Sequence, residues 1–341
     1  MRKLAAIQQI KSIEPIENSD FLELAHVMGW QCVVKKGEFK PGDHGVYFEV
    51  DSFLPLDERY EFLRKTSYRK NEFMGEGFRI KTMTMRGALS QGLFMPLINF
   101  PEIINNDVST GGDVTELLNI RKWELPEIIS SGSGTIIGNK PHGIPTTDEL
   151  RIQSNEDYIE ILTGNAYYIT TKMDGTSCTV YHKNGDCGVC GRNYEYTDDD
   201  ESAMWKYAHK FNIHEKMKEL GRNIAIQGEF CGAGIQKNRL KLLEPELYVF
   251  DIVDLDTMQY LGLEEIIEIT DALGLKRVPL EEEGDSFNYS LGELLEKARG
   301  KYPSGNNKEG IVVRSRQNIG KYGSRISFKV LNNDFLLKEE D

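Results

Sequence analysis

Lys172-Met173-Asp174-Gly175-Thr176-Ser177 follows an apolar and β-branched run, Tyr167 to Thr171. This order predicts a strand that delivers a lysine into a turn, because Asp-Gly pairs favour turns. A lysine at such a strand end becomes a nucleophile once its amine has lost the proton. On these six residues alone, a lysine that merely closes a β-turn is an equally good interpretation.

Further segments follow in a fixed order. They are Cys190-Gly191-Arg192-Asn193, the run from Gln227 to Lys237, Tyr248-Val249-Phe250-Asp251-Ile252, Glu309-Gly310-Ile311-Val312-Val313-Arg314, and Ser327-Phe328-Lys329-Val330. Over about residues 135–335 this series resembles motifs I, Ia, III, IIIa, IV and V of the covalent nucleotidyltransferases, which are RNA ligases, DNA ligases and mRNA capping enzymes. The run Gly228-Glu229-Phe230, with the glycines and Gln236-Lys237 after it, is most similar to RNA ligases related to those that seal nicked duplexes.

The first hundred residues contain short strand-like runs between Gly- and Pro-rich turns, which predicts a small barrel or sandwich. The runs are Val27 to Val34, Gly45 to Val50 and Phe78 to Met85. Lys40-Pro41-Gly42-Asp43 and Val46-Tyr47-Phe48 resemble the amino-terminal OB-fold domain of one RNA ligase branch. We expect Tyr47, Phe48 and Phe53 in its core rather than as platforms for stacked bases.

The second part of the chain has helical spacing in three places, at Glu201 to Leu220, Glu264 to Leu273 and Leu291 to Ala298. We therefore predict an α+β protein. An OB-fold β-barrel would occupy residues 1–125, and a nucleotidyltransferase domain (an ATP-grasp-like ligase domain) of antiparallel sheets and helices would occupy residues 126–341. The Gly/Ser-rich stretch at 130–134 would be the flexible joint.

Composition limits the function classes. The apolar share of 39% and the charged share of 28% are typical of a soluble globular protein. No apolar run reaches about 18 residues, so we expect no membrane span, and the polar start does not resemble a signal peptide.

Five cysteines, an odd number, favour a reducing compartment, which means an intracellular protein of cytoplasm or nucleus. Cys187-Gly188-Val189-Cys190 lacks a second pair, so we do not expect a metal there. We expect a monomer.

The net charge of −13 argues against an indiscriminate nucleic-acid binder. Two strips are nevertheless basic. Residues 314–329 hold five basic and no acidic side chains, and residues 64–86 hold seven basic ones against Glu72 and Glu76. Such strips are compatible with contacts to a phosphate backbone; an ordinary solvated strand face is the alternative for the second.

The resemblance implies a reaction that starts from ATP and Mg²⁺ or Mn²⁺. Lys172 attacks the α-phosphorus to form lysyl-AMP, with Asp174 and Lys329 as the other catalytic residues. It implies that three carboxylates hold the metal through water: Asp174, Glu229 and Glu309. The implied ATP- and AMP-binding residues are Arg151, Lys172, Arg192, Glu229, Phe250, Glu309 and Lys329. Without the family, Phe250 would be a core residue, Arg151 a surface partner of Glu149, and the carboxylates members of separate salt bridges.

Only a neutral amine attacks, so the site must lower the pKa of Lys172. A nearby metal and cationic side chains would lower it, whereas carboxylates raise it. Motif V departs from many relatives, which carry Lys-x-Lys where this chain has Ser327-Phe328-Lys329. One expected cation is therefore missing or supplied elsewhere, and Lys321 and Arg325 lie near it in the sequence.

The resemblance thus implies an ATP-dependent RNA ligase that joins 3′-OH and 5′-phosphate ends, with RNA and ATP as partners, at nicks in duplexes and in RNA repair. DNA ligases and capping enzymes place an OB-fold after the catalytic domain, but only 11 residues follow Val330. A DNA-ligase-like polynucleotide ligase and a non-catalytic RNA-binding protein that retains the fold are the alternatives. An RNA ligase should require a ribose at the 3′-OH end.

Overall fold

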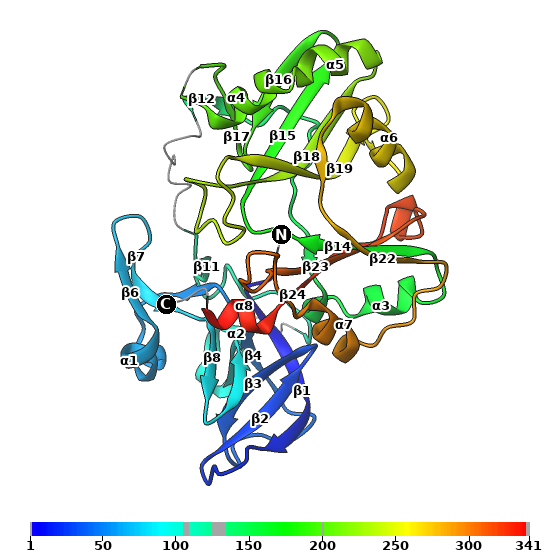
Figure 1. Ribbon diagram of the computed structural model, residues 1–341. Coiled ribbons are helices and arrows are strands. Elements are labelled where there is room, and N and C mark those ends of the chain that lie inside the picture. The colour runs from blue at the N-terminus through cyan, green and yellow to red at the C-terminus, as the bar shows by residue number, and fades with distance from the viewer. Residues whose placement is uncertain (1, 105–108, 125–133, 200, 339–341) are drawn as a thin grey trace. The chain divides into compact units, whose positions relative to one another are not determined.

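A computed structural model describes residues 2–104, 109–124, 134–199 and 201–338. The chain divides into two compact units, residues 1–128 and 129–339 (Figure 1). The predicted domain boundary and, apart from Gly134, the predicted joint lie outside the described residues, so both stay predictions. None of the helices in the described parts of the chain is both long and apolar enough to cross a membrane.

The amino-terminal unit is organised around β1 (Ala5–Pro15), which pairs with β4 (His44–Phe48) at its start and with β2 (Leu22–Val27) further along. A register shift between Ile10 and Ser12 bends β1, and such an irregularity increases the local twist of a strand. One curved sheet results, in the order β10-β4-β1-β2-β3, completed by β3 (Trp30–Lys35) and β10 (Leu93–Pro96).

The remaining elements of this unit are short. A second sheet has the order β11-β5-β7-β6, and β8 pairs with β9. The strands are β5 (Ser52–Leu54), β6 (Tyr68–Asn71), β7 (Gly75–Arg79), β8 (Thr82–Met85), β9 (Ala88–Gln91) and β11 (Arg121–Lys122). The helical turns are η1 (Glu58–Leu63), α1 (Arg64–Ser67), η2 (Leu97–Asn99) and α2 (Pro101–Ile104).

Two of the predicted strand runs are wrong as continuous strands. Val27 to Val34 contains a hairpin turn, because Met28 adopts a left-handed backbone (φ 51°) and Val27 pairs with Trp30. Phe78 to Met85 is divided between β7 and β8, which pair with different neighbours. The prediction that Tyr47, Phe48 and Phe53 belong to the core is confirmed, since each is almost fully buried.

The larger sheet of the carboxy-terminal unit has the strand order β12-β17-β16-β15-β18-β19-β20, and β21 pairs with β19. Its strands are β12 (Ile136–Asn139), β15 (Thr176–Lys183), β16 (Asp186–Cys190), β17 (Tyr194–Tyr196), β18 (Ile224–Cys231), β19 (Glu246–Asp254), β20 (Gln259–Tyr260) and β21 (Lys276–Arg277). Helices α4 (Ala203–Lys210), α5 (Ile213–Leu220) and α6 (Leu263–Leu273) pack against it through one apolar core (Figure 1).

The predicted helix over Glu201 to Leu220 is two helices. Ser202 caps α4, and Asn212, with a left-handed backbone (φ 50°), separates α4 from α5. The apolar period continues across this break, which is why the sequence pattern conceals it. The helices predicted at Glu264 to Leu273 and Leu291 to Ala298 are confirmed, the second as α7 (Leu291–Ala298).

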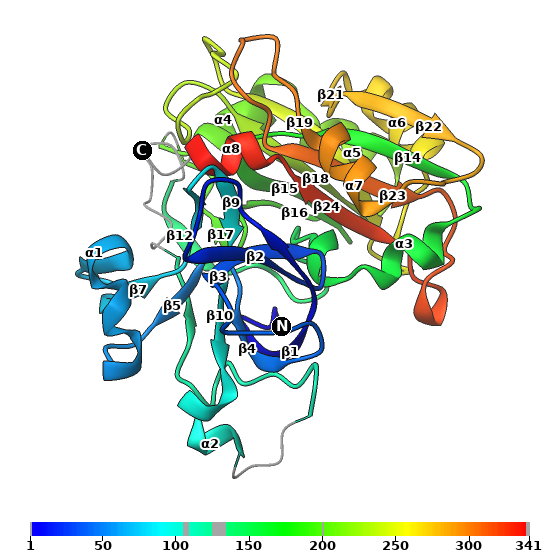
Figure 2. The ribbon, with the colours of Figure 1, turned by 90° about the horizontal axis from the view of Figure 1, so that it is seen from below.

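The smaller sheet of this unit has the order β13-β24-β23-β14-β22. Figure 2 labels β24, β23, β14 and β22 of this sheet. Its strands are β13 (Leu150–Arg151), β14 (Tyr167–Lys172), β22 (Leu280–Gly284), β23 (Gly310–Ser315) and β24 (Ser327–Leu331). Thus the strand predicted at Tyr167 is confirmed. Helix α7 packs on the sheet through Leu294 and Ala298. The other helices are η3 (Ile152–Ser154), α3 (Asp157–Leu162), η4 (Lys321–Gly323) and α8 (Asn333–Lys338).

A buried charge network joins the two sheets of the carboxy-terminal unit. Asp251 on β19 accepts hydrogen bonds from Arg325 at 2.7 and 2.9 Å and from Arg314 on β23 at 3.3 Å. Burial alone would raise the pKa of Asp251, but the two guanidinium groups hold it below its ordinary value. Removing one partner from such a group leaves uncompensated buried charge, which is costly.

We expect Asp251→Asn to lower the free energy of unfolding by about 3–5 kcal/mol, because two buried arginines lose their carboxylate. Urea denaturation at neutral pH measures this loss. The carboxylate's contribution is present above the unfolded pKa of about 3.9 and disappears as the pH falls through the lower folded pKa, so the variant and the parent should converge in acid. Glu265→Gln, in an exposed pair with Arg222, should cost under about 1 kcal/mol. Equal losses in the two variants would contradict this account.

Candidate active site

Lys172 ends β14, opposite Gly310 at the start of β23. Its Nζ lies 2.6 Å from Oε1 of Glu309, which directly precedes β23. The turn after the lysine needs a glycine, because a Cβ on Gly175 would lie 2.4 Å from the carbonyl oxygen of Phe230. Local sequence and close backbone packing together therefore hold the lysine at this strand end.

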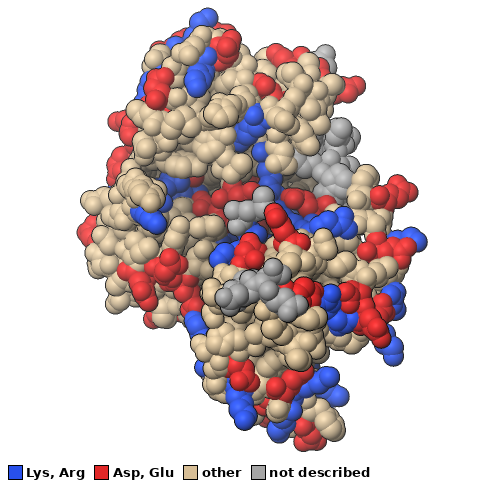
Figure 3. All heavy atoms as spheres, turned by 180° about the vertical axis from the view of Figure 1, so that it is seen from behind, with Lys and Arg blue, Asp and Glu red and all other residues tan. Residues whose placement is uncertain are grey.

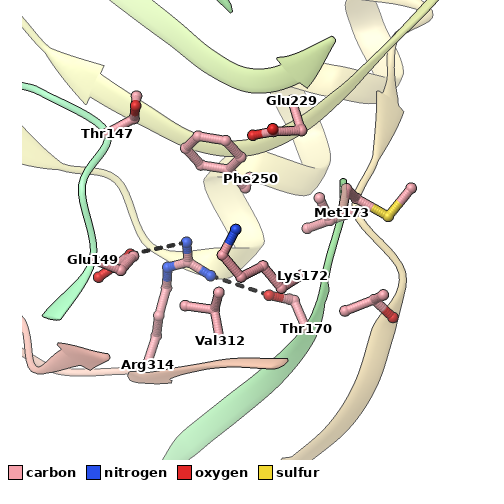
Figure 4. Close-up of a pocket in the computed structure, with 11 residues that line it drawn as sticks. Thr147, Glu149, Thr170, Lys172, Met173, Glu229, Phe250, Val312 and Arg314 are labelled. Atoms are coloured by element: carbon pink, nitrogen blue, oxygen red, sulfur yellow. Dashed lines mark hydrogen bonds and ion pairs between the residues drawn. The ribbon is translucent and has the colours of Figure 1, made fainter. Parts of the chain in front are cut away.

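A pocket adjoins the lysine, and Lys172 itself forms part of its wall. Figure 4 shows the Lys172 amine pointing into this space, with Phe250 and Glu229 beside it and the Arg314 guanidinium between Glu149 and Thr170. The pocket is lined by Thr147, Glu149, Thr170, Thr171, Lys172, Met173, Glu229, Phe250, Val278, Val312 and Arg314. An aromatic ring and aliphatic side chains beside charged groups suit a flat, polar heterocycle.

The protein by itself does not lower the pKa of the lysine. Burial would lower the pKa of Lys172, but the surrounding carboxylates, led by Glu309, outweigh burial and raise it. Burial, together with the neighbouring acids, raises the pKa of Glu229 to about 8 although Lys172 opposes the change. In the protein alone, the amine therefore keeps its proton.

Asp174 lies just past Lys172 and is held by Arg239, whose Nη1 donates to it at 2.7 Å. Burial raises the pKa of Asp174 while Arg239 acts against it. The Arg239 guanidinium also stacks over the Phe335 ring of α8, 4.4 Å from its centroid. The sequence analysis missed Arg239, because no spacing rule connects it to the Lys-x-Asp-Gly segment.

The three predicted metal-binding carboxylates surround Lys172 but do not converge on one point. Within the part of the chain that the structure describes, no three His, Cys, Asp or Glu side chains could ligate one ion directly. Asp174, Glu229 and Glu309 all act electrostatically on Lys172. This donor set fits a hydrated Mg²⁺ or Mn²⁺ held through its water molecules, because Mg²⁺ keeps several waters and needs few direct protein ligands.

Two cations lie side by side on neighbouring strands. Arg151 on β13 is the register partner of Lys329 on β24. Burial, with the positive charges of Lys172 and Arg151, lowers the pKa of Lys329 to about 7. Arg151 thus adds a positive charge to this corner. At the position where many relatives carry a lysine, the Ser327 hydroxyl donates to Glu149 at 2.7 Å.

Arg192 is half-buried, and its Nη2 donates to both carboxylate oxygens of Asp148 at 2.9 Å. It does not line the pocket, although Thr147, the neighbour of Asp148 in the chain, does. The predicted contact between Arg192 and a ligand stays a prediction.

The basic strips differ from what the sequence suggests. Arg314 and Arg325 are buried against Asp251, so these two residues do not contribute to an exposed basic strip. In the other strip, Arg64 and Lys70 pair with Glu61 and Glu76. Figure 3 shows acidic and basic side chains interspersed on the visible face rather than one continuous basic surface.

Comparisons with known proteins follow the same division of the chain. An OB-fold domain family model matches residues 4–97, and an RNA ligase family model matches residues 165–331. A comparison with curated protein sequences gives no match. Two solved structures of mutants of the Naegleria gruberi RNA ligase are each 40% identical in sequence to this chain. The mutant with ATP and Mn has a TM-score of 0.91 over 100% of both chains. The mutant with AMP and Mn has a TM-score of 0.90 over 98% of both chains. A structure of that ligase with pyrophosphate has a TM-score of 0.89 over 98% of both chains.

Proposed function

The chain belongs to the RNA ligase family and is an ATP-dependent RNA ligase, and we propose that Lys172 is its nucleophile and that it seals nicks in RNA-containing duplexes. The observation that carries the assignment is the Lys172–Glu309 pair, 2.6 Å long, at the edge of a pocket that Phe250 also lines. A nucleophilic amine, an aromatic wall and a set of acids are the groups that nucleotide transfer to a lysine requires.

In the first step, Lys172 Nζ attacks the α-phosphorus of ATP. A P–N bond forms, the bond to the bridging oxygen breaks, and pyrophosphate leaves in line. Before the attack, the Lys172 amine gives up its proton to the Glu309 carboxylate, whose Oε1 lies 2.6 Å from Nζ. A divalent cation held through water by Asp174, Glu229 and Glu309 would supply the positive charge that lowers the pKa of Lys172.

Other residues of the site act on the nucleotide rather than on the proton. Lys329 and Arg151 bring positive charge toward the phosphates, where negative charge develops in the transition state. Phe250 stacks on the adenine, and Arg192 contacts the ribose or the RNA end. Glu149 and Thr147 lie at the other side of the pocket, where polar edges of a base would meet them.

The later steps consume the adduct. A 5′-phosphate oxygen attacks the phosphorus of lysyl-AMP, which breaks the P–N bond and returns Lys172 as a free amine. A 3′-OH then attacks the adenylylated 5′-phosphate, so that AMP leaves and a phosphodiester bond forms. Only the first two steps make or break a bond to Lys172, which separates them experimentally from the third.

We expect Lys172→Ala to abolish covalent labelling by ATP that is radiolabelled at the α-phosphate, because the acceptor amine is gone. The labelled protein is read on a denaturing gel after incubation with magnesium. Lys206→Ala, an exposed lysine on α4, should label like the parent. Lys172→Ala should still join a strand that is already adenylylated. Label retained on Lys172→Ala would refute the nucleophile assignment.

We expect Phe250→Ala to weaken ATP binding about 5- to 150-fold, since base–aromatic stacking contributes about 1–3 kcal/mol. Calorimetric titration of ATP and magnesium into a Lys172→Ala background measures the affinity without turnover. Phe250→Tyr keeps the ring and should bind within a few-fold of the parent. Undiminished binding by Phe250→Ala would place the adenine elsewhere.

The substrate prediction concerns the form of the RNA. We expect a nicked duplex with a ribose 3′-OH to be sealed faster than the same strands without their complement. We also expect it to be sealed faster than a nick that ends in a deoxyribose, because the 2′-OH distinguishes RNA from DNA. Product formation is followed on a sequencing gel under single-turnover conditions. Equal rates on nicked and single-stranded RNA would rule out nick specificity and leave the ligase assignment intact.

A further inference from the structure

Tyr302 lies in the loop between α7 and β23, and its hydroxyl sits beside the last paired residues of β14 and β23. The hydroxyl donates a hydrogen bond to the carbonyl oxygen of Lys172 at 2.7 Å. It accepts one from the backbone N–H of Glu309 at 3.0 Å. One oxygen atom therefore connects the residue that carries the amine to the residue that carries the carboxylate.

This connection matters because the two side chains are long. The distance between Lys172 Nζ and Glu309 Oε1 therefore depends on how far apart the backbones of these two residues are held. Beyond the pair Lys172–Gly310, no further β14–β23 register pair is present in the described residues. The Tyr302 hydroxyl supplies a bridge at that point, where the ladder stops.

The tyrosine is itself well fixed. The residue is 4% exposed, and it packs in an apolar cluster with Met173, Cys231 and Val278. Its backbone N–H donates to the carbonyl of Asn306 at 2.8 Å, which closes the loop on itself. A phenylalanine would fill the same space, so the hydroxyl can be removed without creating a cavity in the cluster.

The same loop is also connected to Asp174, another acidic side chain of the candidate active site, through Arg239. The Ser304 hydroxyl and the Asn306 amide both donate to the carbonyl oxygen of Arg239 at 2.6 Å. Arg239 in turn holds Asp174. Residues 302–306 thus contact the backbones of Lys172, Glu309 and Arg239 from one side.

We propose that Tyr302 is a positioning residue for adenylylation, and that its hydroxyl sets the placement of the Lys172 amine relative to Glu309. The proposal rests on the assignment of Lys172 as the nucleophile. Tyr302 is not among the residues that line the pocket, and it acts through the two backbones that it bridges. A displacement of about 1 Å at a reacting group is enough to slow a step roughly 100-fold.

The test is Tyr302→Phe, assayed for two reactions of the same protein preparation. Single-turnover labelling by ATP should slow about 100-fold, with the KM for ATP unchanged because the pocket walls remain. Joining of a strand that is already adenylylated should keep the parental rate, since that step makes no bond to Lys172. Damage to folding alone would lower both rates by the same factor.

Tyr289→Phe is the matched control. Its hydroxyl donates to Glu282 at 2.7 Å, and neither residue lines the pocket. Both reactions should run at the parental rate in this variant. Parental labelling by Tyr302→Phe, or equal losses in its two reactions, would overturn the proposal. A failure of the underlying assignment looks different, because Lys172→Ala would then retain label.

Discussion

The buried contact of Asp251 with Arg314 and Arg325 is the interaction on which the catalytic unit depends. It connects β19 of the larger sheet to β23 of the smaller one and to Arg325, which lies two residues before β24 begins. Moving three charges out of water is expensive, and only their close mutual pairing offsets that cost. Since Arg314 also donates to Glu149 and Thr170, the same network forms one wall of the pocket beside Lys172.

The pocket sits where these two sheets meet, and this explains its mixed lining. Lys172 and Arg314 come from the smaller sheet, whereas Glu229 and Phe250 come from the larger one. Each sheet alone would present a solvated strand face. A change in the packing of the sheets would therefore move Phe250 relative to Lys172.

The carboxylates around Lys172 raise the pKa of its amine in the protein alone. The acids that suit a hydrated cation also hold the proton on the amine. In the proposed mechanism, nucleophilicity therefore depends on the arrival of positive charge, which keeps the lysine inert in the protein alone. In the same proposed mechanism, Lys329 and Arg151, which are register partners on β24 and β13, would supply positive charge to the phosphates.

The spacing of apolar and β-branched side chains predicts a helix or strand correctly where one element spans the whole pattern. The β-branched run before Lys172, the period of α6 and that of α7 each lead to the observed element. Prediction fails where the chain reverses within a continuous pattern, as at Asn212 between two helices and at Met28 between two strands. A single left-handed residue leaves the spacing of apolar side chains almost unchanged, so the reversal is not visible in the sequence.

The sequence by itself determined the order of the motifs, the class of the two units and the residue types that the chemistry needs. Only the tertiary structure decided their partners: that Arg314 and Arg325 turn inward to Asp251, that Arg239 holds Asp174, and that Tyr302 joins Lys172 to Glu309. These contacts join residues far apart in the chain, and a charge or hydroxyl carries no local mark of the group it will meet. Its partner is set by which strands and loops pack together, and that is a property of the whole fold.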